Sequence, residues 1–296
     1  MKIFVTGASG FIGGSVAARL ARAGHQVRGL VRDPAKRDAV RRTGIEPVLG
    51  TLDDAALLTR EAQAADATIN AASSDDRRAV ETLVTALTGS ANALIHTSGS
   101  SIIADEALGE PSDAVFEEDT PFVTHPEKQA RVAIDRLVLG AAGLRGIVVC
   151  PSLIYGTGLG VEPESAQLPR LAALARETGV ARYIGRGLNV WSTVHIADVA
   201  DLFLLALTDA PAGGFYFVEN GEASFAAMVG AIAARLGLGA PQPWAPEEAI
   251  ALLGRQTAVF SLGSNSRVRA RRARALGWVP RHGSVLDWIA TELPKG

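Results

Sequence analysis

Three glycines near the start of the chain have the spacing of a phosphate-binding turn. They follow the apolar run 2–6 and precede residues 15–23, whose pattern predicts a helix. The first would let the chain turn off a strand, the second would let a pyrophosphate approach the backbone, and the third would allow close helix–strand packing. The phosphates would then meet free N–H groups at the positive end of the helix. A glycine-rich turn without a ligand is the alternative. The segment predicted to bind a dinucleotide is Gly7, Ala8, Ser9, Gly10, Phe11, Ile12 and Gly13.

The end of the next predicted strand, residues 26–31, bears on the choice between NADP and NAD. In dinucleotide folds an acidic residue about 20 positions after the glycines holds the ribose 2′-hydroxyl, whereas an arginine accommodates the 2′-phosphate of NADP. Arg32 directly follows the strand, and Lys36 and Arg37 lie close behind it. We therefore expect NADP, bound through Arg32, while Asp33 leaves NAD open. Lys36 and Arg37 are equally explained as the solvated start of a helix.

The composition is that of an ordinary soluble protein. The 296 residues are 48% hydrophobic with a net charge of −2, which gives no electrostatic attraction to nucleic acid or to a membrane. We expect no signal peptide and no bilayer-spanning segment. The single cysteine, Cys150, lies in an apolar run, so we expect a buried thiol, no disulfide and a cytoplasmic protein. Five arginines within residues 267–274 are expected to form an exposed helix face rather than a nucleic-acid site.

Short apolar runs alternate with helical stretches along the chain. This alternation predicts an α/β fold, a Rossmann-type doubly wound parallel sheet with a smaller C-terminal substrate lobe, whose ligands collect at the carboxyl ends of the strands. We expect a dinucleotide-binding domain over 1–156 and a substrate lobe mainly over 157–296, with a segment at about 190–218 returning to the sheet. Further strands are predicted near 45–49, 67–69, 93–98, 147–150 and 214–218, and helices near 54–64, 76–88, 126–142, 225–236, 247–253 and 284–293.

Several motifs resemble those of the short-chain dehydrogenase/reductases, in their extended branch of NAD-dependent epimerases and dehydratases. Residues 6–13, TGASGFIG, are similar to the TGxxGxxG signature. Residues 191–200 resemble the family's V-H-V-x-D-V-A segment, and residues 276–280, LGWVP, resemble its L-G-W-x-P ending. The resemblance spans the chain and implies an NAD(P)-dependent enzyme acting on a carbonyl or alcohol of a small organic or sugar-like substrate. A homodimer through two long helices on one face of the sheet would also fit this family.

The resemblance implies three further segments against the cofactor. Residues 50–54 resemble the family's G-D-L-x-D turn beside the adenine, although a threonine stands in place of the first aspartate. Small residues follow the strand 67–69, where the family's backbone passes the cofactor. Residues 151–156 resemble the family's R-P-x-x-V-Y-G segment beside the nicotinamide, with Cys150 in place of the arginine. The implied contacts are Thr51, Leu52, Ala71, Ala72, Pro151, Ser152 and Leu153.

The family's catalytic residues are only partly present. The resemblance implies a hydroxyl after the strand 93–98, and Ser98 or Ser100 would polarise the reacting oxygen. The family's Tyr-x-x-x-Lys pair is absent, because none of the three tyrosines lies between the strands 93–98 and 147–150. Matching the following helix to the family gives Glu127 for the tyrosine and Arg131 for the lysine. Glu127 would serve as an acid or base if burial raised its pKa, and Arg131 would still bind ribose.

Other residues near this helix and beyond it are candidate contacts. Lys128 lies one residue out of phase and is a second candidate for the ribose ligand or the proton source. His125, whose residue type can exchange a proton near neutral pH, and a water are further candidates for the proton source. His125 is also assigned to the substrate, as are Tyr155 and Trp191. A structural role or a solvated helix face is the alternative for each of them. No metal ligands are assigned.

We therefore expect an NADP-dependent oxidoreductase with an altered proton relay and a small-molecule substrate. An epimerase or dehydratase cycle is a variant of the same chemistry. A non-catalytic NADP(H)-binding regulator or scaffold is the alternative, because the motif tyrosine is missing. Turnover distinguishes the two, since a sensor would bind cofactor and leave its redox state unchanged.

Overall fold

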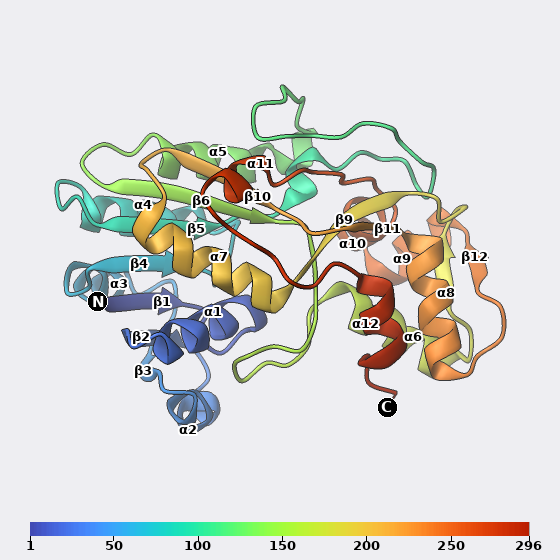
Figure 1. Ribbon diagram of the computed structural model, residues 1–296, viewed down its shortest axis with the longest axis horizontal. Helices are drawn as coiled ribbons and strands as arrows, with labels where there is room; N and C mark the ends of the chain where they lie inside the picture. Colours follow the sequence, from blue (N-terminus) through green and yellow to red (C-terminus); the bar gives the residue numbers. More distant parts are fainter. Residues whose placement is uncertain (296) are drawn as a thin grey trace.

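The computed structural model describes residues 1–295, which build a large lobe around a parallel sheet and a smaller lobe beside it (Figure 1). The sheet has the strand order β3-β2-β1-β4-β5-β6-β10, and each neighbouring pair is parallel. The order reverses between β1 and β4, where a doubly wound sheet opens a crevice for ligands. The predicted Rossmann-type fold is confirmed. The strands are β1 (Lys2–Thr6), β2 (Gln26–Val31), β3 (Glu46–Leu49), β4 (Ala67–Asn70), β5 (Ala93–Thr97), β6 (Arg145–Pro151) and β10 (Gly214–Val218).

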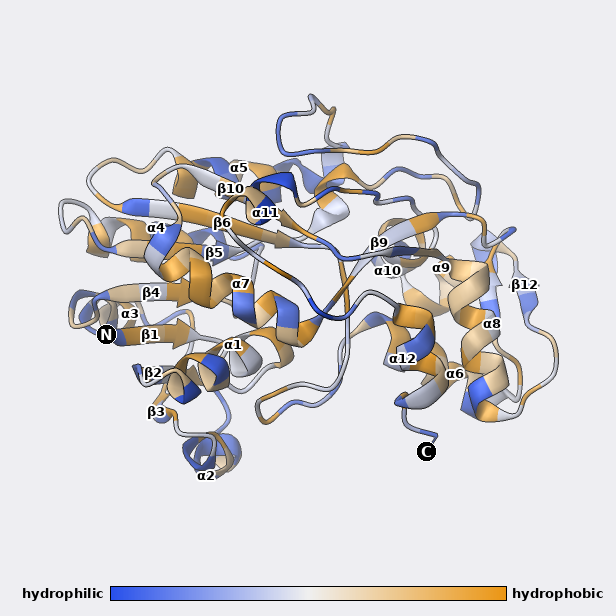
Figure 2. Ribbon diagram, in the orientation of Figure 1, coloured by the Kyte–Doolittle hydropathy of each residue, from blue (hydrophilic) through white to orange (hydrophobic). Residues whose placement is uncertain are grey.

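Helices cover both faces of this sheet (Figure 1). On one face α1 (Phe11–Arg22) and α7 (Ile196–Asp209) pack through residues such as Leu20 and Phe203. On the other face α3 (Ala55–Gln63), α4 (Arg77–Leu87) and α5 (Gln129–Leu139) pack through Leu58, Leu83 and Ile134. The central strands β1, β4, β5 and β6 are almost wholly buried, which is why they read as apolar runs, whereas the outer strands β2 and β3 carry exposed residues (Figure 2). The short α2 (Arg37–Arg42) follows the 3-10 turn η1 (Pro34–Lys36) beside β2.

The smaller lobe packs four helices around a core that includes Met228 and Trp288. These helices are α6 (Gln167–Thr178), α8 (Phe225–Leu236), α9 (Pro246–Leu253) and α12 (Val285–Thr291). Two small sheets join them, β11-β9-β7 and β12-β8. Their strands are β7 (Leu153–Tyr155), β8 (Arg182–Ile184), β9 (Val190–His195), β11 (Glu222–Ser224) and β12 (Gln242–Trp244). Of the stretch 190–218, α7 and β10 belong to the large lobe, whereas β9 pairs within the three-stranded sheet.

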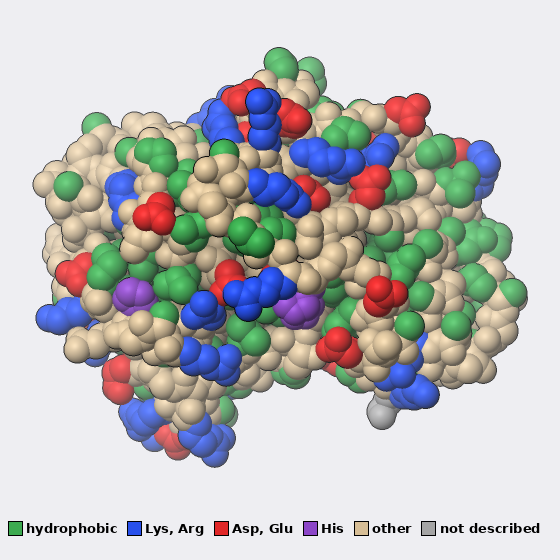
Figure 3. All heavy atoms as spheres, viewed as in Figure 1, with side chains coloured by type: hydrophobic (Ala, Val, Ile, Leu, Met, Phe, Trp, Pro, Cys, Tyr) green, Lys and Arg blue, Asp and Glu red, His purple; other side chains and the backbone are tan. Residues whose placement is uncertain are grey.

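Two segments differ from their predicted helices. The stretch 126–142 is divided into the 3-10 turn η3 (Pro126–Lys128) and α5. The arginine-rich segment is extended at first, and its helix α11 spans Arg271–Ala275. Basic and acidic side chains lie next to one another on this side of the molecule (Figure 3). The five arginines are therefore ion-pair partners rather than one exposed helix face, and their partners are Glu117, Asp119, Glu219 and Glu222.

None of the helices in the described part of the chain combines the length and apolar character that crossing a membrane would need.

Candidate active site

The glycine turn after β1 has the backbone geometry that its sequence predicts. Gly7 has φ +72°, and a Cβ there would lie 2.8 Å from the carbonyl oxygen of Ala71. A Cβ on Gly13 would lie 2.4 Å from the Gly7 carbonyl oxygen, so the start of α1 packs directly on the turn. A Cβ on Gly10 would meet that same oxygen at 3.4 Å and otherwise project into free space. No side chain caps α1, so its first N–H groups are available to an anion in that space.

Hydrogen bonds of Thr6 fix the neighbouring end of β4. The Thr6 hydroxyl oxygen accepts the N–H groups of Ala71 (3.1 Å) and Ala72 (3.2 Å) and donates its own proton to Asn70 Oδ1 (2.6 Å). The small residues after β4 are thereby held beside the glycine turn.

A cleft of about 930 Å³ opens over the carboxyl ends of these strands and extends to the smaller lobe. It brings together the glycine turn, the hydroxyls after β5, the start of α5 and Trp191. The predicted residues that line it are Gly10, Phe11, Ile12, Ala71, Ala72, Ser98, Ser100, Glu127, Lys128, Arg131, Pro151, Ser152 and Trp191. The predicted residues outside its lining are Gly7, Ala8, Ser9, Gly13, Arg32, Thr51, Leu52, His125, Leu153 and Tyr155.

Two of the residues outside the lining are placed away from the predicted contacts. Leu153 is fully buried in the core of the smaller lobe, so its side chain does not reach a cofactor in the cleft. Tyr155 is 1% exposed, donates a hydrogen bond to the His282 carbonyl oxygen (3.1 Å) and lines a separate cavity with His195. β7 directs the Tyr155 side chain into the smaller lobe and away from this cleft, so its assignment to the substrate stays a prediction.

The end of β2 presents a free cation. The Arg32 side chain is exposed and has no hydrogen-bond or ion-pair partner among residues 1–295. Asp33 is engaged, since its Oδ1 accepts the Ala35 N–H at 2.9 Å and caps η1. Thr51 is also used locally, because its hydroxyl accepts the Asp53 N–H at 3.3 Å.

The two candidate serines differ in what they contact. Ser98 is buried, lines the cleft and donates a hydrogen bond to Asp135 Oδ2 at 2.7 Å. Ser100 is 1% exposed, and its hydroxyl lies 2.8 Å from that of Ser266. The hydroxyl of Ser98 is therefore next to a buried acid, whereas that of Ser100 ties η2 (Ser100–Ile103) to the segment after η4 (Ala258–Leu262).

The three candidates on η3 and at the start of α5 also have different surroundings. Glu127 is exposed, and its hydrogen bond with Arg255 lowers the pKa of the carboxyl. The burial on which its predicted role as an acid depended is absent. Lys128 is buried, its Nζ donates to Gln256 Oε1 at 2.7 Å, and burial lowers the pKa of its ammonium group. Arg131 is held by both carboxylate oxygens of Asp75, with Nε 2.8 Å from Oδ1.

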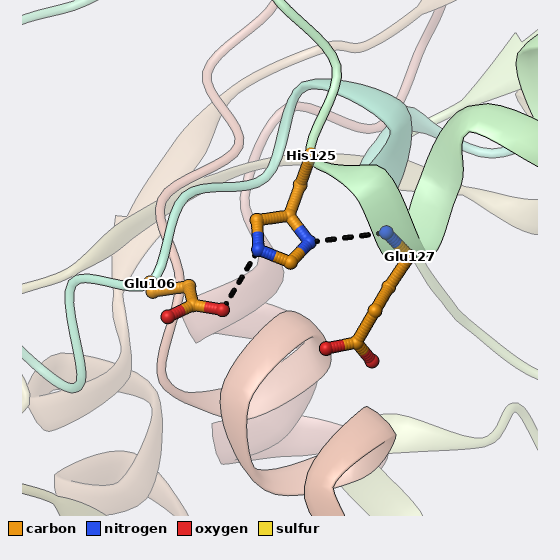
Figure 4. A group of neighbouring side chains, drawn as sticks. All are labelled: Glu106, His125 and Glu127. Carbon is orange, nitrogen blue, oxygen red and sulfur yellow. Dashed lines mark hydrogen bonds and ion pairs between the residues drawn. The ribbon is translucent and has the colours of Figure 1, made fainter.

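The side chains of Glu106, His125 and Glu127 lie close together next to η3 (Figure 4), and Arg255 links this ion cluster to the smaller lobe. His125 Nε2 lies 2.9 Å from Glu106 Oε1, and His125 Nδ1 accepts the Glu127 N–H at 3.2 Å. Arg255, from α10 (Arg255–Thr257), pairs with both glutamates and so supplies their counter-charge. His125 does not line the cleft, but its ring packs on Phe260, which does, with ring centroids 4.7 Å apart.

Several residues that line the cleft were not identified as functional from the sequence. Asp75 follows β4 and binds Arg131, which lies 56 positions away. Gln256 and Phe260 come from the smaller lobe and surround Lys128, whose Nζ lies 5.0 Å from the Phe260 ring. Ser165 lines the cleft with a buried hydroxyl that has no partner among the described residues. Asp135 lies behind the cleft rather than in its lining and reaches it only through its hydrogen bond with Ser98.

A profile of the NAD dependent epimerase/dehydratase family matches residues 3–218, which extend from β1 to the end of β10.

Curated relatives align with most of the chain. It is 32% identical to "Oxidase ucsJ" from an Acremonium species, over 94% of this chain and 92% of the relative. It is 30% identical to a 4-hydroxy-2-methyl-3-oxo-4-farnesyl-3,4-dihydroquinoline-1-oxide ketoreductase from Stigmatella aurantiaca, over 75% of this chain and 69% of the relative.

Among solved structures, the chain resembles a dTDP-glucose 4,6-dehydratase from Bacillus anthracis in complex with NAD. The TM-score is 0.77 at 17% identity, and the match covers 99% of this chain and 97% of the other. At this identity the likeness shows the shared fold.

Proposed function

The chain belongs to the NAD dependent epimerase/dehydratase family, and on this premise we propose that it is an NADP-dependent oxidoreductase that interconverts a carbonyl and an alcohol on a small organic substrate. The observation that carries this proposal is the cleft that joins the glycine turn to the hydroxyl of Ser98. The ketoreductase named among the relatives supports the reaction type.

The glycine turn fits a dinucleotide. The free space over Gly10 and the uncapped start of α1 suit a pyrophosphate, because a Cβ at Gly10 would occupy the space that the phosphates need. Ala72, Pro151 and Ser152 line the cleft further along, where a nicotinamide would lie. When bound, the reduced nicotinamide supplies the hydride.

We assign the preference for NADP to Arg32. Its guanidinium is exposed and uncommitted among the described residues, whereas the neighbouring Asp33 carboxylate is occupied as a cap. A 2′-phosphate gains charge-assisted hydrogen bonds from such an arginine, while a 2′-hydroxyl would need a free carboxylate there.

The charges of the cleft favour a substrate without a diphosphate. Within residues 1–295 its lining holds two cations, Lys128 and Arg131, and Arg131 is already paired with Asp75. Arg182 and Arg186 do not line it. One cation, the faces of apolar side chains and a few hydroxyls suit a neutral or singly charged carbonyl compound.

The alternative is a non-catalytic NADP(H)-binding regulator. It is favoured by one observation, that the positions matched to the family's tyrosine and lysine are Glu127 on η3 and Arg131 on α5. Such a protein would bind the cofactor with the same glycine turn and Arg32, and would leave it unchanged with every substrate.

The first test is a fluorescence titration with NADPH, NADP, NADH and NAD. We expect NADPH to bind more tightly than NADH, and Arg32→Ala to reduce NADPH affinity by about 10- to 100-fold, since a hydrogen bond to a charged group is worth about 1.5–3 kcal/mol. NADH affinity should change little. Arg42→Ala is the matched control, because Arg42 is exposed on α2 and has no ion pair among the described residues. Failure to bind any dinucleotide would contradict the proposal.

A further inference from the structure

We propose that Asp135 holds the proton that Ser98 passes to the substrate oxygen; this inference rests on the oxidoreductase function proposed above. Asp135 lies on the buried face of α5 and is 2% exposed. Its Oδ2 lies 2.7 Å from the Ser98 hydroxyl oxygen. Ser98 lines the cleft and Asp135 does not, so the serine stands between the acid and the substrate.

The hydrogen-bond network behind Asp135 determines the protonation of His96. The Thr6 hydroxyl must donate to Asn70 Oδ1, because its oxygen already accepts two backbone N–H groups. Asn70 therefore turns its Nδ2 toward His96, and His96 Nδ1 accepts that hydrogen bond at 3.0 Å. The His96 proton is consequently on Nε2, which faces Asp135 Oδ1 at 3.7 Å. Neither of these two atoms has a hydrogen-bond partner within residues 1–295.

No cation is paired with the Asp135 carboxyl in the described structure. The nearby Arg131 guanidinium is bound by Asp75 and by the Ser101 hydroxyl. Burial raises the pKa of Asp135 to about 6, against smaller lowering effects of the Ser98 hydrogen bond and of the nearby Arg131 charge.

The other groups that face Asp135 carry no charge that would stabilise its ionised form. Burial lowers the pKa of His96 to about 4, so the imidazole is neutral at the pH where Asp135 titrates. The Cys150 thiol on β6 is fully buried, and burial raises its pKa well above the ordinary value. Below about pH 6, Asp135 is thus protonated beside a neutral histidine and a neutral thiol.

Protonation of Asp135 reverses its hydrogen bond with Ser98. An ionised Asp135 accepts a hydrogen bond from the Ser98 hydroxyl, so this hydroxyl cannot donate a hydrogen bond into the cleft. A protonated Asp135 donates to the Ser98 oxygen over the same 2.7 Å, and the serine proton becomes free to donate to a carbonyl oxygen. Only the second state both polarises the carbonyl and supplies a proton.

The proton balance of the reduction follows from this arrangement. As hydride reaches the carbonyl carbon, the Ser98 O–H proton passes to the substrate oxygen and the Asp135 proton passes to Ser98. The products are an alcohol, the oxidised cofactor and an Asp135 carboxylate. Water entering the cleft after product release returns a proton to Asp135 through Ser98. In the oxidation of an alcohol every step runs backwards.

The proton on Asp135 can be measured without cofactor or substrate. We expect the infrared spectrum of the unliganded protein to contain a protonated-carboxyl band that disappears with a midpoint near pH 6 and is absent from Asp135→Asn. Glu118→Gln is the control, because burial also raises the pKa of that carboxyl and it lies outside the cleft lining. Persistence of the band in Asp135→Asn, or its absence from the wild type at pH 5, would overturn the inference.

The transfer through Ser98 is tested by the pH dependence of NADPH oxidation, with 4-nitrobenzaldehyde as the probe. We expect wild-type kcat to fall as the pH rises through about 6, and Asp135→Asn to be about 10²-fold slower with a flat profile. Ser98→Ala should lose turnover and keep the Asp135 infrared band. An active Asp135→Asn with the wild-type profile would overturn the relay alone. A wild type that binds NADPH but reduces neither this probe nor other carbonyl compounds would overturn the proposed function instead.

If Asp135→Asn does not fold, Ser98→Ala carries the test. Removal of the Ser98 hydroxyl should raise the midpoint of the Asp135 band, since the hydrogen bond from that hydroxyl lowers the pKa. An unchanged midpoint in Ser98→Ala would show that the two groups are not coupled and would overturn the inference.

Discussion

At the residue scale, the two serines that follow β5 can be separated by their partners. Ser98 joins a buried carboxyl to the cleft, whereas the hydroxyl of Ser100 is engaged by Ser266. We expect Ser98→Ala to reduce kcat by about 10²-fold or more, the usual cost of removing a donor to a developing oxyanion. Ser100→Ala should keep turnover within a fewfold and instead lower the free energy of unfolding, by about 1 kcal/mol for one lost hydrogen bond. Carbonyl reduction assays and urea unfolding of both variants measure this split.

The reverse pattern, with Ser100→Ala inactive and Ser98→Ala active, would indicate that the reacting substrate oxygen lies beside Ser100 on η2. In that case the Ser100–Ser266 hydrogen bond would have to open when substrate binds.

The Asp135 and His96 pair also predicts how stability depends on pH. Asp135 has a folded-state pKa raised from 3.8 to about 6. Its contribution to the free energy of unfolding is therefore fully present below pH 4 and is lost as the pH rises through 6. His96 has a folded-state pKa lowered from 6.5 to about 4, so its contribution is lost as the pH falls from 6.5 toward 4. In the wild type the two effects oppose each other.

Asp135→Asn removes one of these effects. The free energy of unfolding of Asp135→Asn minus that of the wild type should therefore increase as the pH rises from 4 to 6. The increase should reach up to about 3 kcal/mol, at 1.36 kcal/mol per pKa unit. Urea unfolding at several pH values measures this. A difference between the two proteins that does not change with pH would show that Asp135 titrates normally in the folded state.

Part of the site could be predicted at this scale and part could not. The glycine turn and Ser98 could be located because their chemistry is encoded over a few consecutive residues. Asp75 could not, because it meets Arg131 from a loop 56 positions away. The pairing of Glu127 with Arg255 spans 128 positions, so the lowered pKa of this carboxyl could not be predicted from neighbouring residues.

At the element scale, the β1–α1 turn contains glycines with separable roles. Gly13→Ala would place its methyl 2.4 Å from the Gly7 carbonyl oxygen, and we expect it to lower the free energy of unfolding by about 1–3 kcal/mol through overpacking. Gly10→Ala meets free space, so its stability should stay within about 1 kcal/mol of wild type while NADPH affinity falls by about 10-fold or more. Urea unfolding and NADPH titration of the two variants test this.

Equal losses of stability in both variants would contradict the assignment of Gly10 to the phosphates.

Elements with a strong apolar period could be predicted, and shorter elements could not. The central strands of the large lobe are buried on both faces, which produces clear apolar runs. The strands of the smaller lobe β7, β8 and β11 have three residues each, too few to show a period. Helix α6 had a detectable signal, since Leu168, Leu171, Ala172 and Ala175 follow helical spacing on its buried side.

At the scale of the whole molecule, contacts across the cleft link substrate binding to the position of the smaller lobe. Arg255 and Gln256 reach from α10 to Glu127 and Lys128 on the large lobe. We expect Arg255→Ala to raise KM for the carbonyl substrate severalfold without changing NADPH affinity, because the loosened contact leaves the substrate half of the cleft less ordered. Hydrogen exchange in residues 255–262 should accelerate.

Arg186→Ala is the matched control for this prediction. Its ion pair with Glu110 is also exposed, with Nη1 3.1 Å from Oε2, and neither residue lines the cleft. A similar rise in KM for both variants would attribute the effect to general loss of surface charge.

The pairing of β10 with β6 has a consequence for biosynthesis. Residues 147–151 have their partners at 214–218, so a chain that ends at 156 would leave β6 as a bare, apolar strand edge. Until β10 has been synthesised, that edge can pair with another nascent chain. Protection of this edge, by a chaperone or by rapid arrival of the later residues, would then decide how much protein accumulates in a cell. A truncated dinucleotide-binding half should consequently aggregate rather than persist as a smaller folded protein.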